Sequence, residues 1–140
     1  MKEICLDTGV IGIILSSNPT NQVKKLMKDI LRKQIKALTP RPVLIEAYYH
    51  ICAISGKEVA KISILNFIKK YSIKIIDFDN DMTVLAGLLK CQHRSALSYI
   101  DCMAIAIALS KKIEFHTTEK RLKKIPHNVL SRLFVIKYNF

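Results

Sequence analysis

The sequence LSYIDCMAIAIAL occupies residues 97–109 and contains a single carboxylate, Asp101. The stretch is too short to cross a bilayer, which needs about 20 apolar residues. Its alanine and aliphatic side chains suit a helix that is buried on most sides. Ser98 is placed to cap that helix, and the helix dipole favours a negative charge at Asp101 in the first turn. Because an unpaired carboxylate beside a buried helix is costly, we expect a metal ion to bind it, together with acids from elsewhere in the chain.

The composition favours one compact domain that spans residues 1–140. Half of the residues are hydrophobic, and only four are glycine and four proline, which argues against disorder. The four cysteines show neither a Cys-x-x-Cys pair nor a cysteine–histidine zinc spacing, so we expect free thiols. No apolar signal segment follows Met1, and we therefore predict a cytoplasmic protein without a membrane partner.

The net charge predicts a polyanionic partner. Twenty-three lysines and arginines stand against eleven aspartates and glutamates, which gives a formal charge of +12. Such a surface favours nucleic acid. The charge alone is equally compatible with the alternative that the lysines only keep the protein soluble.

Short apolar runs alternate with helical segments along the chain, which predicts an α/β fold with a largely parallel sheet and right-handed crossovers. A turn is expected at residues 7–9, directly after the first run. The predicted strands cover residues 3–6, 35–39, 72–78, 113–116 and 133–136. The predicted helices cover residues 22–36, 42–55, 58–70, 81–91 and 98–110, and the basic segment 120–124 is expected to form a helical turn.

Four acidic residues fall at positions that a parallel sheet would bring to one edge. Asp7 and Glu119 follow predicted strands, while Glu46 and Asp101 lie in the early turns of the helices that come after strands. In such sheets the functional site lies beyond the carboxyl ends of the strands. Carboxylates held close together repel one another, and a hard divalent cation such as Mg²⁺ or Mn²⁺ removes that penalty. The four acids therefore predict a divalent metal site.

Each acid also has a purely structural interpretation. Asp7 would be a turn former, Glu46 a snorkelling or salt-bridged helix residue, Asp101 a helix-dipole acid, and Glu119 a solvated acid paired with Lys120 or Lys123. The aspartates at 77, 79 and 81 lack the glycine and the closing glutamate of an EF-hand loop, so they are expected to cap a helix. No metal or catalytic role is expected for the four scattered histidines.

Four segments together resemble the PIN domain family in order and spacing. They are LDTGV at residues 6–10, Glu46 in a proline-led apolar helix, LSYIDCMA at residues 97–104, and TTEKRL at residues 117–122. The resemblance covers almost the whole chain. It implies a three-layer α/β/α sandwich with a central, largely parallel sheet of four or five strands.

The resemblance also implies a function. PIN domains are metal-dependent endoribonucleases, and many small ones resemble the toxin of a VapBC-type pair, which is usually a dimer inhibited by an antitoxin protein. The catalytic acids would be Asp7, Glu46, Asp101 and Glu119, with Mg²⁺ or Mn²⁺ held by the first three. Thr8, Ser98 and Thr117 would orient the acids or hold water. Two alternatives stay open: a nuclease that processes ribosomal RNA, and a catalytically weak PIN module that binds RNA or a protein partner.

Three residues depart from the family pattern. Gly9 stands where the family often has asparagine, so a side-chain contact is lost there. Glu119 stands where aspartate is commoner and reaches about one methylene further, so it would contact a metal through water. Arg121 stands where a further aspartate is frequent.

Overall fold

The computed structural model describes residues 1–120, 122, 125 and 131–139. Its central sheet has five parallel strands in this part of the chain, in the order β3-β2-β1-β4-β5. The strands are β1 (Lys2–Leu6), β2 (Ile35–Pro40), β3 (Lys74–Ile76), β4 (Glu114–Thr117) and β5 (Val135–Lys137). Because the strands all run the same way, their carboxyl ends meet at one edge of the sheet.

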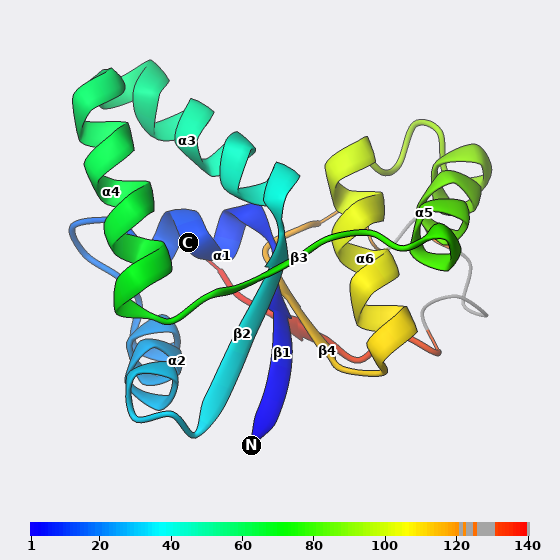
Figure 1. The fold of residues 1–140 in the computed structure, drawn as a ribbon, viewed down its shortest axis with the longest axis horizontal. Coiled ribbons are helices and arrows are strands. Elements are labelled where there is room, and N and C mark those ends of the chain that lie inside the picture. The colour runs from blue at the N-terminus through cyan, green and yellow to red at the C-terminus, as the bar shows by residue number, and fades with distance from the viewer. Residues whose placement is uncertain (121, 123–124, 126–130, 140) are drawn as a thin grey trace.

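Helices cover both faces of the sheet. They are α1 (Thr8–Ile14), α2 (Asn21–Leu31), α3 (Arg41–Ser55), α4 (Lys57–Lys70), α5 (Asn80–Gln92) and α6 (Tyr99–Lys111). Figure 1 shows α1 to α4 on one side of the strands and α5 and α6 on the other. The predicted α/β sandwich with a parallel central sheet is therefore confirmed.

Helix α6 is the buried helix that residues 97–109 predict. Its alanines and isoleucines from Ala104 to Ala108 are at most 1% exposed, and the helix packs against β1, β2 and β4. The small alanine side chains let the helix approach the sheet closely enough for the Cys5 thiol of β1 to donate to the carbonyl of Ala104, at 3.5 Å. The apolar stretch therefore forms the centre of the core, as its composition indicates.

Two boundaries at the start of the chain differ from the prediction. The turn expected at residues 7–9 is the beginning of helix α1, since Asp7 caps this helix by accepting from the Thr8 amide at 2.8 Å. Aspartate is a good N-cap as well as a turn former, so the sequence pattern was compatible with both. Helix α2 ends at Leu31 rather than at residue 36, because Lys33 has a φ of 59° and Ile35 already pairs with Lys2 of β1.

The other predicted elements agree within a few residues. The strand expected at 72–78 is confined to Lys74–Ile76, and Asp79 caps α5 by accepting from the Met82 amide at 2.7 Å, as expected for a capping aspartate. The last strand is shifted to Val135–Lys137. Arg121 and most of the basic segment 120–124 lie outside the described residues. Across the described residues, no helix is both long enough and apolar enough to cross a membrane.

Candidate active site

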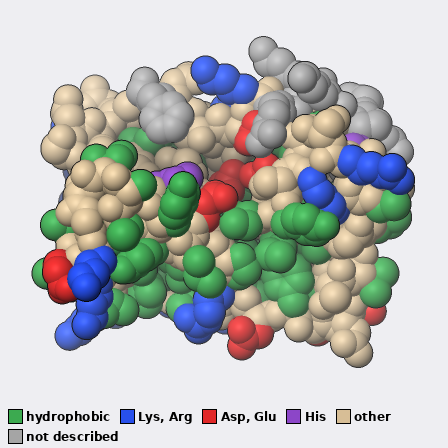
Figure 2. All heavy atoms as spheres, turned by 90° about the horizontal axis from the view of Figure 1, so that it is seen from above, with side chains coloured by type: hydrophobic (Ala, Val, Ile, Leu, Met, Phe, Trp, Pro, Cys, Tyr) green, Lys and Arg blue, Asp and Glu red, His purple; other side chains and the backbone are tan. Residues whose placement is uncertain are grey.

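One pocket of about 290 Å³ collects all four predicted acids. Asp7 follows β1, Glu46 comes from α3, Asp101 from α6, and Glu119 follows β4. Figure 2 shows the face above the strand ends, where acidic side chains gather in a hollow near the middle of the view. The rest of the lining is Thr8, Gly9, Gly12, His50 and Thr118. Residues far apart in the sequence therefore meet here.

Asp7 is the most tightly held of the four acids. Its side chain is 4% exposed, Oδ1 accepts from the Thr8 amide, and Oδ2 accepts from the Thr117 hydroxyl, each at 2.8 Å. The Asp7 backbone amide donates to the carbonyl of His116 at 3.0 Å, which joins the end of β1 to β4. The carboxylate therefore has a fixed orientation toward the pocket before any ligand binds.

The environment of Asp7 raises its pKa to about 7. The largest cause is desolvation by burial, and the negative charge of Asp101 is the next. The two hydrogen bonds from Thr117 and Thr8 lower the pKa but do not offset these effects, and Glu46 adds a smaller repulsion. A cation in the pocket would favour the ionised form of Asp7, because its positive charge would offset the destabilising effects of burial and of the neighbouring acids.

Asp101 is fixed by a reciprocal cap at the start of α6. The Ser98 hydroxyl accepts from the Asp101 amide at 3.1 Å, and Asp101 Oδ2 accepts from the Ser98 amide at 3.0 Å. This capping box satisfies two backbone amides that a helix end leaves without intrahelical partners. The Ser98 amide thus holds the carboxylate of Asp101, a residue that is 7% exposed.

Glu46 and His50 lie one turn apart on α3, and both line the pocket. Glu46 is half-buried, whereas His50 is exposed. No role was expected for any histidine, so the place of His50 at the pocket was missed. The available signal was its spacing, since residues i and i+4 of a helix lie on one face.

The turn after β4 carries the fourth acid. The Thr117 hydroxyl accepts from the Glu119 amide at 2.9 Å while it donates to Asp7. Thr117 is fully buried and Glu119 is half-buried at the pocket. One hydroxyl therefore links the position of the turn to the orientation of Asp7.

The pocket offers the donor set of a hard cation, although the acids do not form a closed cage. Within residues 1–120, 122, 125 and 131–139, no group of three His, Cys, Asp or Glu side chains is arranged so that it could hold a metal ion. The Thr8 hydroxyl, in contrast, is buried beside the acids and has no hydrogen-bond partner among the described residues. Mg²⁺ keeps several of its waters and is often bound by one or two carboxylates. Carboxylates with an orphaned hydroxyl therefore fit a hydrated divalent ion.

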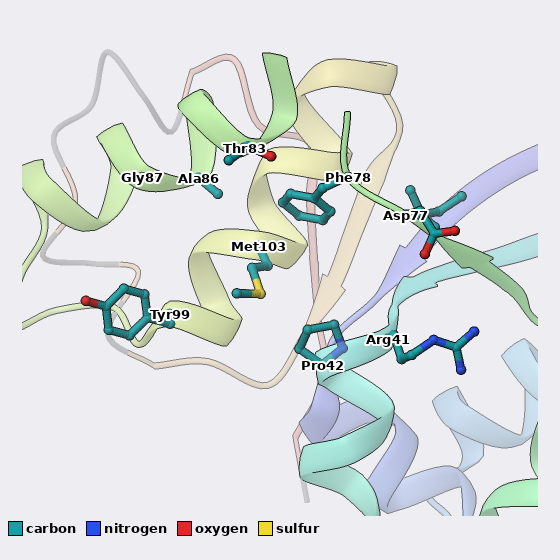
Figure 3. Close-up of a pocket in the computed structure, with 10 residues that line it drawn as sticks. Arg41, Pro42, Asp77, Phe78, Thr83, Ala86, Gly87, Tyr99 and Met103 are labelled. Atoms are coloured by element: carbon teal, nitrogen blue, oxygen red, sulfur yellow. The ribbon is translucent and has the colours of Figure 1, made fainter. Parts of the chain in front are cut away.

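A second, larger groove has different chemistry. Its volume is about 450 Å³, and it lies between the start of α3 and the helices α5 and α6. Figure 3 shows Pro42, Phe78, Tyr99 and Met103 among its lining side chains, with Asp77 as the acid. Arg41 is the basic residue of this otherwise largely apolar lining, which lacks the group of carboxylates that a hard metal ion needs. The acid pocket is therefore the better candidate for metal-dependent catalysis.

Three solved structures share this fold over nearly their whole length. VapBC2 from Rickettsia felis, bound to a DNA fragment from its promoter, is 18% identical, covers 98% of this chain and 99% of its own, and has a TM-score of 0.74. DNA-bound VapBC from Salmonella typhimurium is 15% identical, with 98% of each chain covered and a TM-score of 0.71. VapC20 from Mycobacterium tuberculosis, a toxin that cleaves the sarcin-ricin loop, is 15% identical, covers 94% of this chain and 96% of its own, and has a TM-score of 0.68.

At the level of sequence, no curated protein matches the chain significantly. The family model of the PIN domain, in contrast, matches residues 4–128. That range contains all four acids of the pocket, the helices α3 and α6, the strand β4 and the last three residues of β1. Sequence match, sheet order and the shared fold of the three solved structures agree, and the chain belongs to the PIN domain family.

Proposed function

We propose that this chain is a metal-dependent endoribonuclease that hydrolyses RNA phosphodiester bonds, and that it is the toxin of a VapBC-type toxin–antitoxin pair. The observation that carries the proposal is the single pocket in which Asp7, Glu46, Asp101 and Glu119 meet. A buried carboxyl whose pKa is raised to about 7 by burial and by a neighbouring acid is typical of a functional site. Membership of the PIN domain family supports nuclease chemistry.

Mg²⁺ or Mn²⁺ is the proposed cofactor, shared by Asp7, Glu46 and Asp101 as a hydrated ion that one or two of the carboxylates contact directly and the rest through its waters. When bound, such an ion polarises a phosphate, lowers the pKa of a water molecule and neutralises charge on the departing oxygen. The Thr8 hydroxyl would hold one of the waters, because it is buried at the pocket without a partner in the described part of the chain.

The chain itself supplies orientation and a place for the substrate. Thr117 and Ser98 fix the carboxylates of Asp7 and Asp101, so little reorganisation is needed when a ligand binds. Glu119, at the wall of the pocket, is proposed to orient the attacking water. The net charge of +12 would hold the RNA backbone without reading its sequence.

The proposed biological role is supported by the solved relatives. VapBC2 and the Salmonella VapBC are toxin–antitoxin assemblies, and VapC20 cleaves the sarcin-ricin loop. By analogy, we propose an antitoxin protein as the partner of this chain, a homodimer as its assembly, and ribosomal or other structured RNA as the substrate class. At identities of 15–18%, what these structures share with the chain is the fold.

A catalytically weak PIN module that binds RNA is the second candidate. Gly9 and Glu119 favour it, since both depart from the family pattern at the pocket. The two candidates differ in one property: an active nuclease binds Mn²⁺ and cleaves RNA, whereas a weak module binds RNA only.

The test is RNA cleavage with Mn²⁺, with and without chelator, by the wild type and by Asp101→Asn. The matched control is Asp81→Asn, which changes an exposed helix acid outside the pocket. We expect the wild type and Asp81→Asn to cleave equally, and Asp101→Asn or chelator to abolish cleavage. Cleavage that persists in Asp101→Asn would contradict the proposal, and RNA binding without Mn²⁺ binding in calorimetry would establish the weak module instead.

A further inference from the structure

Gly9 and Thr118 approach each other more closely than any side chain at position 9 would allow. A Cβ atom built on Gly9 would lie 1.9 Å from Thr118 Oγ1, 3.0 Å from its Cβ and 3.2 Å from its Cγ2. Rotation of the Thr118 side chain would relieve the first contact but would leave its Cβ in place, so the backbone of the turn would also have to move. We propose that Gly9 is a positioning residue: its missing side chain lets Thr118 dock on helix α1 and thereby sets the place of Glu119 at the acid pocket.

The turn that carries Glu119 is held on α1 at two neighbouring points. At Thr117, the hydroxyl donates to Asp7 and accepts from the Glu119 amide. At Thr118, the side chain rests on Gly9, and both residues line the pocket with the acids. A turn fixed at two adjacent residues has little freedom left at the third, which is Glu119.

Among the helical glycines of the described residues, only Gly9 has a neighbour that a side chain would meet. A Cβ atom on Gly12, in the same helix, or on Gly87, in α5, would meet nothing within 4 Å. The space at Gly9 is therefore taken by Thr118 and is not left empty. The Thr118 side chain, from the turn after β4, fills the space that a side chain at position 9 would occupy.

The docking also bears on where the carboxylate of Glu119 lies. Glu119 carries one more methylene than aspartate, and the place that its carboxylate reaches in the pocket depends on where the backbone of the turn is held. Docking of Thr118 on Gly9 fixes how far that backbone stands from Asp7. Because Glu119 matters only if the acid pocket works as a nuclease site, this inference rests on the proposed function.

The experiment compares Gly9→Ala, Thr118→Gly and the double variant. Two measurements are made on each: the hydrogen exchange of the Glu119 amide, which bonds to Thr117, and Mn²⁺ affinity by calorimetry. Gly87→Ala is the matched control, because it also replaces a helical glycine but lies outside the acid pocket. Hydrogen exchange of the Glu119 amide can be measured without metal, so it tests the docking of Thr118 separately from metal binding.

We expect Gly9→Ala to speed exchange of the Glu119 amide and to weaken Mn²⁺ binding on the order of tenfold, the usual effect of losing a group that orients ligands. Thr118→Gly, which removes all three close atoms and with them the docked side chain, should cause a similar loss. The double variant should lose no more than either single variant, because both changes act on the same contact. Gly87→Ala should behave as the wild type. Exchange and affinity that stay unchanged in Gly9→Ala would overturn the proposal, as would losses in the two single variants that add up in the double variant.

The outcomes separate this proposal from the proposed function. If the wild type binds no Mn²⁺, the nuclease proposal fails, and the exchange rates alone then decide whether Gly9 positions the turn. If Gly9→Ala speeds exchange but leaves Mn²⁺ affinity intact, the positioning of Glu119 for the metal site is overturned, while the metal site itself stands.

Discussion

The Thr117 hydroxyl donates a 2.8 Å hydrogen bond to Oδ2 of Asp7, across 110 positions of sequence. It joins the last residue of β4 to the residue that follows β1, and these two strands pair side by side in the sheet. The same hydroxyl accepts from the Glu119 amide. One side chain therefore orients an acid from each of two segments that meet at the edge of the sheet.

Thr117→Val should impair the site while keeping its shape. Valine has nearly the same volume as threonine but lacks the hydroxyl, so Asp7 loses the hydrogen bond that Thr117 donates to it. Since this hydrogen bond lowers the pKa of Asp7, the pKa should rise further in the variant. We expect Mn²⁺ affinity and RNA cleavage to fall on the order of 10- to 100-fold. Thr117→Ser keeps the hydroxyl and should retain most of the activity; equal activity in Val and Ser variants would show that the hydrogen bond is unimportant.

Ser98→Ala should separate helix capping from metal binding. Loss of an N-cap side chain costs about 1 kcal/mol in the free energy of unfolding. Thr20→Ala is the matched control, because Thr20 caps α2 by accepting from the Val23 amide at 3.4 Å, away from the pocket. Both variants should be less stable in thermal unfolding, but only Ser98→Ala should also weaken Mn²⁺ binding in calorimetry. Equal Mn²⁺ affinities in the two variants would argue against a role for Ser98 in orienting Asp101.

RNA binding should depend steeply on salt. A charge of +12 attracts the phosphate backbone, and each neutralised phosphate releases counterions, so log affinity falls linearly with log salt concentration. With the cleavage-deficient Asp101→Asn, binding of unrelated RNA sequences should show similar slopes in fluorescence anisotropy. Affinity that is insensitive to salt would exclude this mode of RNA contact.

Much of the fold was predictable because its signals are local. The buried helix, its Ser98 cap and the parallel strands follow from composition, spacing and capping chemistry. Helix α1 was missed because Asp7 suits a turn and a cap equally well, and the choice depends on the Asp7 contacts with Thr117 and His116, which are remote in sequence.

The candidate site was predictable to the level of its acids and no further. The positions of the four acids relative to the predicted strands and helices indicated that their carboxylates meet at one edge of the sheet. In the structure all four line one pocket. The docking of Thr118 on Gly9 was not predictable, since it depends on a backbone separation that no sequence pattern encodes. His50 could have been noticed from its spacing to Glu46, but helical spacing alone does not tell which face borders a pocket.

The contribution of Asp7 to the free energy of unfolding of the metal-free protein should fall as the pH rises from about 4 to about 7. Burial and the charge of Asp101 raise the pKa of Asp7 from 3.8 to about 7. Between these two pKa values, the Asp7 carboxyl is protonated in the folded protein but ionised in the unfolded chain. Each increase in pH therefore lowers the free energy of unfolding. Above pH 7 both states are ionised and the loss is complete.

Asp7→Asn isolates this effect, because an amide does not titrate. With chelator present, the melting temperature of the wild type relative to Asp7→Asn should decrease from pH 5 to pH 8, whereas Asp81→Asn should follow the wild type. Mn²⁺ must displace the proton from Asp7, so its affinity for the wild type should rise with pH up to about 7 and then level off, and bound Mn²⁺ should restore stability at pH 8. If the melting temperatures of the wild type and of Asp7→Asn change in parallel with pH, then Asp7 is already ionised in the folded protein. The acids of the pocket would then not repel one another strongly enough to need a cation.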